Sequence, residues 1–323
     1  MLDELIRDFV PLDIEKLRPD GFYENFFGAK ENDVNRVENG SGWENWDRCP
    51  ICGSDNREAE FSYLDINIVR CPECTHRYTD RVPVNLDEVY DSTAYLDAIK
   101  TLELQQQDYR ANRFGMERVE LVKGLFNDTN RSVLDVGCGW GYFLGQLQTA
   151  GFDCYGIELS KPVAEIAREK YNLNISSTPI QTYETEVPFD LITLFGVIEH
   201  IKEPVDFLGH CRRLLKESGF ILLFTPNFES VAVHVQKERA NMVYPGQHIH
   251  HFTLKSMKKL GELNHMSVAS SCTKGIDVGD ICGYYKYLKK YEIAAFLQKN
   301  ATVLQSVIDQ SACGNHMRVI LQN

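Results

Sequence analysis

Four cysteines in two pairs form the clearest chemical pattern in the chain. Cys49 and Cys52 are separated by two residues, as are Cys71 and Cys74, and 18 residues lie between the pairs. Two such turns can supply four thiolates to a tetrahedral zinc ion, whereas ordinary core cysteines do not require this spacing. Because four thiolates leave no open coordination position, the pattern predicts a structural zinc site. Residues 61–69, between the pairs, are expected to form a hairpin strand.

A second pattern is a strand followed by a glycine turn. The run from Val133 to Val136 is apolar except for Asp135, and Gly137, Gly139 and Gly141 follow at alternate positions. A strand, a glycine turn and a helix begin the nucleotide site of doubly wound α/β folds. The glycines would let a ligand lie against the main chain. The dinucleotide fingerprint needs its third glycine at position 142, which is a tyrosine here.

This G-x-G-x-G order after an acidic strand end resembles the first motif of class I S-adenosylmethionine (SAM)-dependent methyltransferases. The resemblance extends over residues 131–323 and implies an α/β fold, a seven-stranded Rossmann-like domain whose last strand, 316–321, is reversed. The other strands are expected at 152–157, 174–177, 189–195, 219–225 and 266–275. Glu158, 21 residues after Gly137, is expected to accept the ribose hydroxyls. The implied SAM contacts are Asp135, Gly137, Cys138, Gly139, Gly141, Glu158, Leu159, Gln181 and Phe195.

Glu199 and His200 directly follow the fourth expected strand, at the sheet edge where open α/β folds bind ligands. SAM is already activated, so the protein must mainly align the acceptor and remove its proton. His200 can act as a base near neutral pH, with Glu199 orienting the ring. The alternative is that the pair only caps the next helix. On a later loop, His250 and His251 are further candidates for the base or for substrate contact, unless they simply bond to the backbone.

The Glu-His position has two uses in the methyltransferases that the chain resembles. In zinc-containing sugar C-methyltransferases such a pair takes part in proton removal. In ubiquinone-pathway and small-RNA methyltransferases a Glu-x-x-Glu-His run supplies metal ligands. Gly196 replaces the first Glu here, which argues against the same metal site. The extra carboxyl-terminal domain of the sugar C-methyltransferases is not seen, so O-methylation is the expected reaction and C-methylation the alternative.

Composition and charge restrict the expected partners. The chain of 323 residues is 43% hydrophobic and has a net charge of -12, and residues 1–85 carry 18 acidic against 10 basic side chains. An acidic module would repel phosphates, so a small acceptor, such as a sugar or nucleotide-linked sugar, is favoured over tRNA or rRNA. Without a membrane-length apolar run or a basic leader, we expect a cytoplasmic protein. A non-catalytic SAM-binding scaffold is the alternative outside enzymes.

Four regions are expected along the chain. Residues 1–48 form an arm, 49–85 the zinc ribbon, 86–130 a helical cover over the SAM pocket, and 131–323 the methyltransferase domain. Tyr90, Tyr95 and Tyr109 could line the pocket from the cover. An insertion at 276–314 carries clustered tyrosines and lysines. It could bind the diphosphate of a substrate or form a homodimer contact, unless it is a solvated helix face.

Overall fold

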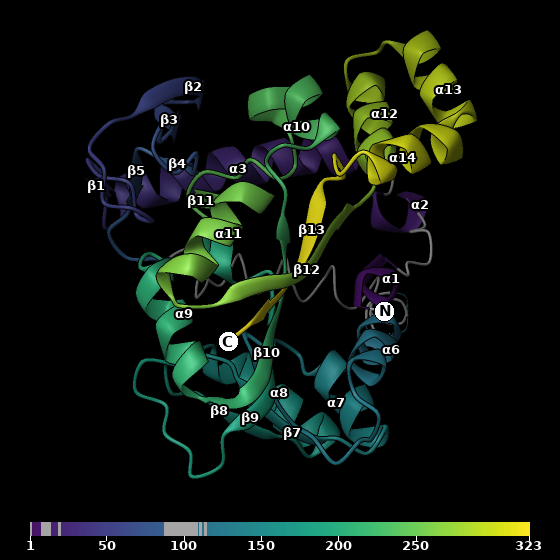
Figure 1. Ribbon diagram of the computed structural model, residues 1–323. Coiled ribbons are helices and arrows are strands. Elements are labelled where there is room, and N and C mark those ends of the chain that lie inside the picture. The colour runs from purple at the N-terminus through teal and green to yellow at the C-terminus, as the bar shows by residue number, and fades with distance from the viewer. Residues whose placement is uncertain (1, 8–13, 19–20, 87–108, 110–111, 113–114) are drawn as a thin grey trace.

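The structure is a computed structural model that describes residues 2–7, 14–18, 21–86, 109, 112 and 115–323. Tyr90 and Tyr95, which the sequence suggested as pocket residues, lie outside the described ranges. The described part contains a central sheet with helices on both faces, a small cysteine-bearing module, and a group of helices at one end (Figure 1).

The central sheet has seven strands in the order β12-β13-β10-β9-β6-β7-β8. Strand β13 lies between β10 and β12 and runs opposite to the other six strands of this sheet. This is the predicted class I methyltransferase sheet with its reversed last strand, so the predicted fold class is confirmed. The strands are β6 (Ser132–Val136), β7 (Asp153–Ile157), β8 (Asn174–Ser176), β9 (Phe189–Phe195), β10 (Leu215–Pro226), β12 (Ser267–Lys274) and β13 (His316–Gln322).

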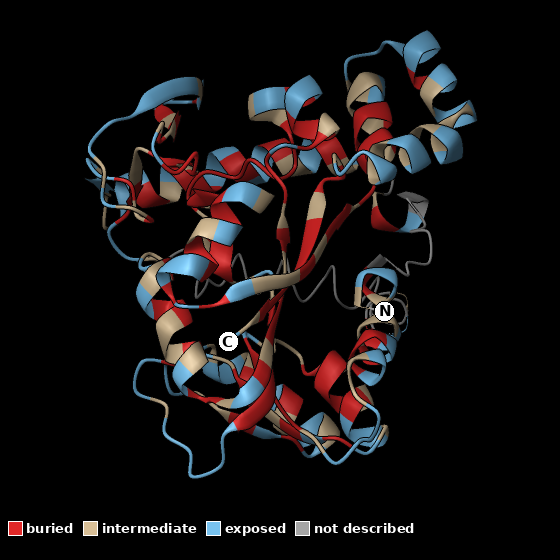
Figure 2. Ribbon diagram, in the orientation of Figure 1, coloured by how far each residue is buried: buried red, intermediate tan, exposed pale blue. Residues whose placement is uncertain are grey.

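Both faces of the sheet are covered because successive residues of a strand point to opposite faces. In β9, Leu191 packs with α6 (Met116–Leu125), α7 (Tyr142–Thr149) and α8 (Lys161–Tyr171). Ile192 and Leu194 pack on the other face with α9 (Pro204–Arg213) and α11 (Leu254–Leu263). Figure 2 shows the central strands buried between these layers. A continuous apolar run therefore suits a strand buried on both sides.

The cysteine-bearing module contains two small sheets. One pairs β1 (Trp43–Asn45) with β5 (Arg81–Pro83), and the other has the order β11-β4-β3-β2. The expected hairpin is present as β2 (Glu58–Tyr63) and β3 (Ile66–Arg70), followed by β4 (Arg77–Thr79). The edge strand β11 (His250–His251) comes from far along the chain, and Figure 1 shows it beside the module. The module is therefore joined to the predicted methyltransferase region by a shared sheet.

The amino-terminal helices pack on the rest of the chain. Helix α1 (Leu2–Arg7) contacts β12 and α6, and α2 (Ile14–Leu17) follows it. In α3 (Phe22–Asn39), Tyr23 donates to the Asp280 carbonyl at 2.7 Å, and Asp33 accepts from the Tyr244 hydroxyl at 2.7 Å. The described part of the arm thus packs on its own chain.

The insertion forms α12 (Asp277–Tyr287), α13 (Tyr291–Lys299) and α14 (Ala301–Gln310), which lie together at one end of the molecule near α10 (Val231–Gln236) (Figure 1). No helix in the described ranges is both long and apolar enough to cross a bilayer.

Candidate active site

The glycine turn between β6 and α7 has the backbone shape that the sequence suggested. Gly137 and Gly139 have φ of +73° and +52°, in the left-handed region that favours glycine. A Cβ at Gly137 would lie 2.7 Å from Cγ2 of Val197, whereas a Cβ at Gly139 would meet nothing within 4 Å. The turn therefore leaves bare backbone facing open space at Gly139. The short distance from Gly137 also brings the turn beside the Gly196–His200 segment.

Acidic side chains lie on both sides of this turn. Glu158, just after β7, accepts hydrogen bonds from the backbone nitrogens of Gly139 and Ser160, both at 2.9 Å. Asp135 is buried within β6 and accepts from the Thr193 hydroxyl at 2.6 Å, and burial raises its pKa to about 7. Glu158 is thus placed at the turn, where a ribose would lie, while Asp135 lies underneath it.

The other predicted SAM contacts lie around the same end of the sheet. Cys138 is within the turn, and burial raises the pKa of its thiol. Leu159 is 57% exposed next to Glu158, and Gln181 is exposed in the turn after β8. Phe195, at the end of β9, contacts the guanidinium of Arg118, whose Cζ lies 4.2 Å from the ring centre. The fold therefore brings these residues to one sheet edge, although they come from separate segments.

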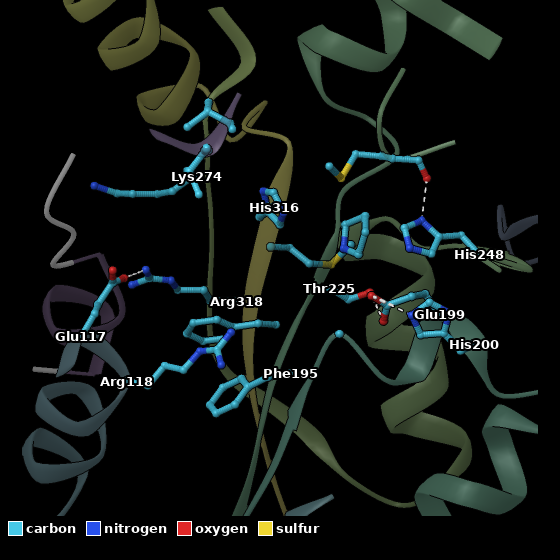
Figure 3. A pocket seen from close by; sticks show the side chains of 18 of the residues that line it. Glu117, Arg118, Phe195, Glu199, His200, Thr225, His248, Lys274, His316 and Arg318 are labelled. Carbon is cyan, nitrogen blue, oxygen red and sulfur yellow. Dashed lines mark hydrogen bonds and ion pairs between the residues drawn. The ribbon is translucent and has the colours of Figure 1, made fainter. Parts of the chain in front are cut away.

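A cavity of about 430 Å³ opens beyond the ends of β9 and β10. Glu199, His200 and His248 lie on one side of it, and Arg118, Arg318 and Glu117 on the other (Figure 3). The positive side chains Arg18, Arg118, Lys274 and Arg318 all line the cavity. Arg18 lies 2.9 Å from Asp280, and Arg318 pairs with Glu117.

Glu199, His200 and His248 form a tight polar cluster at the cavity. One ligand atom from each lies within 4.8 Å of the other two. His200 Nδ1 donates to the carbonyl of Gln247 at 2.9 Å, and His248 Nδ1 donates to the carbonyl of Met242 at 2.9 Å. A neutral imidazole that donates from Nδ1 carries its lone pair on Nε2. The backbone thus selects the same tautomer in both rings, and His200 Nε2 lies 3.9 Å from Glu199 Oε1.

Burial keeps both rings of this cluster neutral. It lowers the pKa of His200 to about 4 and that of His248 to about 4. Burial also raises the pKa of Glu199, whose Oε2 accepts from the Thr225 hydroxyl at 2.9 Å. At neutral pH the cluster therefore presents two imidazole lone pairs beside a carboxyl group. Such a set can accept a proton from a hydroxyl or hold a cation.

His250 and His251 do not line the cavity, contrary to the expectation that either contacts substrate. His250 is 2% exposed, and its Nε2 donates to the carbonyl of Ile201 at 2.7 Å. Its Nδ1 lies 3.0 Å from Nε2 of His76, so both ring nitrogens already have partners. His251 is 3% exposed and packs on Phe228. Their strand pairing with β4 buries both rings away from the cavity, so neither is placed to act as the base.

Several cavity residues were missed from sequence because their segments are far apart. Thr225 lies at the end of β10 and His316 at the start of β13, and the antiparallel pairing of these strands brings the two positions near each other. Arg118 comes from α6, the helix before β6 of the central sheet. The expected diphosphate-binding lysines and tyrosines of the insertion do not line this cavity: Lys286 and Tyr287 line a separate one with Arg18. His248 was not among the predicted site residues, although it lies on the same loop, two residues before His250.

The four cysteines of the module converge as their spacing predicted. Cys49 and Cys74 have their sulfurs 3.5 Å apart, as do Cys52 and Cys71, and all four sulfurs lie within 4.8 Å of one another. A tetrahedral ion about 2.3 Å from each sulfur requires sulfurs separated by roughly 3.8 Å. The arrangement therefore fits a four-thiolate zinc site, on the opposite side of β11 from the cavity cluster.

Comparison with known proteins gives matches to methyltransferases. A family model described as a methyltransferase domain matches residues 106–265. Ubiquinone biosynthesis O-methyltransferase of Hydrogenovibrio crunogenus is 30% identical over 146 residues, which cover 41% of this chain and 60% of that protein. The enzyme of the same name from Proteus mirabilis is 25% identical over 194 residues, covering 57% of this chain and 78% of that protein. The first match thus spans less than two thirds of the relative.

Solved structures give the same fold at low identity. The plantazolicin methyltransferase BamL, in complex with a triazolic desmethylPZN analog and SAH, aligns with a TM-score of 0.50 at 14% identity. The alignment covers 72% of this chain and 91% of that one. At this identity the likeness concerns the fold alone. The strand order, the glycine turn and the methyltransferase-domain model over residues 106–265 together show that the chain contains a class I SAM-dependent methyltransferase domain.

Proposed function

We propose that the protein transfers the methyl group of SAM to a hydroxyl of a small acceptor held in the cavity. The main support is the position of the Glu199–His200 turn. It touches the glycine turn through Val197 and lines the cavity, so a methyl donor and an acceptor would meet there. The relatives reported above are named O-methyltransferases. A non-catalytic scaffold would not need a polar cluster at this junction.

His200 is the proposed base. Its Nδ1–H is anchored on the Gln247 carbonyl, which directs the Nε2 lone pair toward Glu199 and the cavity. Because the pKa of His200 is near 4, the ring is already deprotonated at neutral pH. Proton removal would coincide with methyl transfer, since a base this weak cannot deprotonate a hydroxyl beforehand. Glu199 would orient the acceptor hydroxyl or stabilise the imidazolium that forms.

A divalent cation bound by Glu199, His200 and His248 is the second candidate for the same step. Two neutral imidazoles with Nε2 lone pairs and one carboxylate are a common set of metal ligands. The carbonyls of Gln247 and Met242 accept from Nδ1 of the two rings and so fix their tautomers, as hydrogen-bond partners of metal-bound histidines commonly do. A cation there would lower the pKa of an acceptor hydroxyl. A Cβ at Gly196 would lie 3.7 Å from Glu199 Oε1, so glycine leaves open the place of a further ligand.

The acceptor that we propose is a sugar or a nucleotide-linked sugar. Hydroxyl-rich acceptors suit the polar wall of the cavity, and Lys274 and the arginines that line it suit an attached phosphate. The acidic amino-terminal region disfavours tRNA and rRNA. C-methylation of a sugar is the alternative within this acceptor class.

We further propose that the four cysteines bind zinc, which requires reduced thiols and so suits a cytoplasmic enzyme. A homodimer is also proposed. It would use the exposed apolar side chains of α13 and α14, among them Phe296 and Val303, which are 60% and 67% exposed. Light scattering of the purified protein would test this, and a monomer at all concentrations would refute it.

Incubation with methyl-labelled SAM and cell extract tests the function. The extract is afterwards separated into nucleic acid, lipid, protein and small-molecule fractions, and we expect label in the small molecules. Label only in nucleic acid would contradict the proposed acceptor class. Repeating the assay with a chelator and then with added Mg²⁺ or Mn²⁺ separates the two candidates, because only the cation-dependent reaction would be lost and restored.

A further inference from the structure

The strand β11 lies between the cysteine module and the active-site turn. His250 pairs with Tyr78 of β4. The carbonyl of Ile249 accepts from the backbone nitrogen of Thr79 at 3.1 Å, and the nitrogen of Ile249 donates to the carbonyl of Glu199 at 3.0 Å. Ile249 is therefore bonded to the module on one side and to the active-site turn on the other.

The side chain of His250 makes a second connection between the same two parts. Its Nε2 donates to the carbonyl of Ile201, the residue after the candidate base, and its Nδ1 therefore accepts from Nε2 of His76. His76 is fully buried and lies two residues after Cys74. Its carbonyl accepts from the nitrogen of Cys71 at 2.8 Å. The turn that carries two of the four cysteines is thus bonded, through two imidazole rings, to the backbone of the active-site turn.

We propose that the four-cysteine module positions the active-site turn, and that His76 and His250 are positioning residues for Glu199 and His200. This inference rests on the proposed function, because it assigns a role relative to that active site. Neither ring lines the cavity, so neither would contact the acceptor. Zinc bound by the cysteines would hold the turn that carries His76, and β11 would transmit that constraint to Glu199 and His200.

Three substitutions of His250 separate hydrogen bonding from simple packing. His250→Gln places an amide nitrogen near the ring Nε2 and can keep the bond to Ile201. His250→Asn places an amide oxygen near Nδ1 and can keep only the bond to His76. His250→Phe fills much of the volume and makes neither bond, which leaves a buried carbonyl and a buried N–H without partners. The ring packing on Trp46 is retained best by the phenylalanine.

The readout is the ring ¹⁵N spectrum of His200 in full-length, zinc-loaded protein, which reports whether Nδ1 carries the proton. We expect the Nδ1-protonated form in the wild type and in His250→Gln, and a mixture of tautomers in His250→Asn and His250→Phe. His316, on the opposite strand β13, is the internal control and should keep its spectrum. If His250→Phe leaves His200 as in the wild type, or if His316 changes equally, the proposal is wrong.

Removal of the zinc from the wild-type protein by a chelator gives a second test, which also applies if His250→Phe does not fold. The chelator is then removed and Mg²⁺ is added, so that any cation held by Glu199, His200 and His248 is replaced before the spectrum is recorded. The His200 spectrum should change in the same way while SAM affinity, measured by calorimetry, stays unchanged. An unaltered His200 spectrum after zinc release would overturn the proposal. No acceptor is needed, so a protein that binds no SAM before zinc removal would count against the proposed function and not against the positioning role.

Discussion

The most informative perturbation removes the proposed base without removing its anchor. In His200→Asn the side-chain nitrogen occupies the place of Nδ1 and can still donate to the Gln247 carbonyl, which lies 2.9 Å from Nδ1 in the structure. The variant has no group at the place of Nε2. Loss of a general base typically lowers turnover about 100-fold or more, which is about 2.7 kcal/mol of transition-state stabilisation. We expect this loss in kcat with little change in the affinity for SAM.

The pH dependence provides an independent check of the same reasoning. Burial lowers the pKa of His200 to about 4, and only the neutral ring can accept a proton. Turnover of the wild type should therefore fall as the pH drops through about 4, and not near the ordinary histidine value of about 6.5. In His200→Asn this acidic limb should disappear. His200→Gln should lose the base and also its anchor on Gln247, so it should be at least as slow.

The assay is methyl transfer from labelled SAM to the acceptor identified by fractionation, measured from pH 8 down to about one pH unit below the pKa of about 4. His234→Asn is the matched control, because His234 also donates from Nδ1 to a backbone carbonyl at 2.9 Å but does not line the cavity. It should keep wild-type turnover. Turnover of His200→Asn within about tenfold of the wild type would refute the base assignment. If the acidic limb persisted in that variant, His248 would become the base to test.

Three further predictions concern the cofactor, the metal and acid stability. Gly139→Val and Glu158→Ala should fold but lose SAM affinity. The valine fills the open space at the glycine turn, and the alanine removes the carboxylate there. Calorimetry that shows normal SAM binding in both variants would contradict the proposed SAM site. Metal analysis should find about one zinc per chain, and Cys71→Ser should lower both the zinc content and the thermal stability while SAM binding persists; zinc-free protein of native stability would contradict this. Burial lowers the pKa of His316 to about 4, below its value of about 6.5 in the unfolded chain, so the folded protein disfavours the charged ring. The contribution of the neutral ring to stability is complete above pH 6.5 and is lost progressively as the pH falls from there through 4. At pH 5 this loss is about 2 kcal/mol, so denaturant unfolding of His316→Asn should show a correspondingly smaller drop in stability between pH 7 and pH 5 than that of the wild type.

The sequence determined the parts of this protein that depend on local pattern. Strand β9 is recognisable because a strand covered by helices on both faces must be apolar along its whole length. The turn at Gly137–Gly141 is recognisable because left-handed backbone favours glycine. The spacing of the cysteines likewise predicts their convergence, because each C-x2-C turn can place two thiolates on the same tetrahedral ion. With the family resemblance that they support, these features predicted the fold class, the reversed last strand and the end of the sheet at which ligands are expected to bind.

The roles of the histidines depend on contacts between distant parts of the chain. His248 and His250 are two residues apart on one loop, and composition and spacing treat them alike. Pairing of β11 with β4 turns the ring of His250 into a buried contact with His76, while the preceding turn leaves His248 at the cavity beside His200. The physical reason is that residues 77–78 and 250–251 pair although they are far apart in the sequence. Neither segment by itself shows which strand it will pair with. The cavity, the ring tautomers and the shift of the His200 pKa all follow from such long-range contacts.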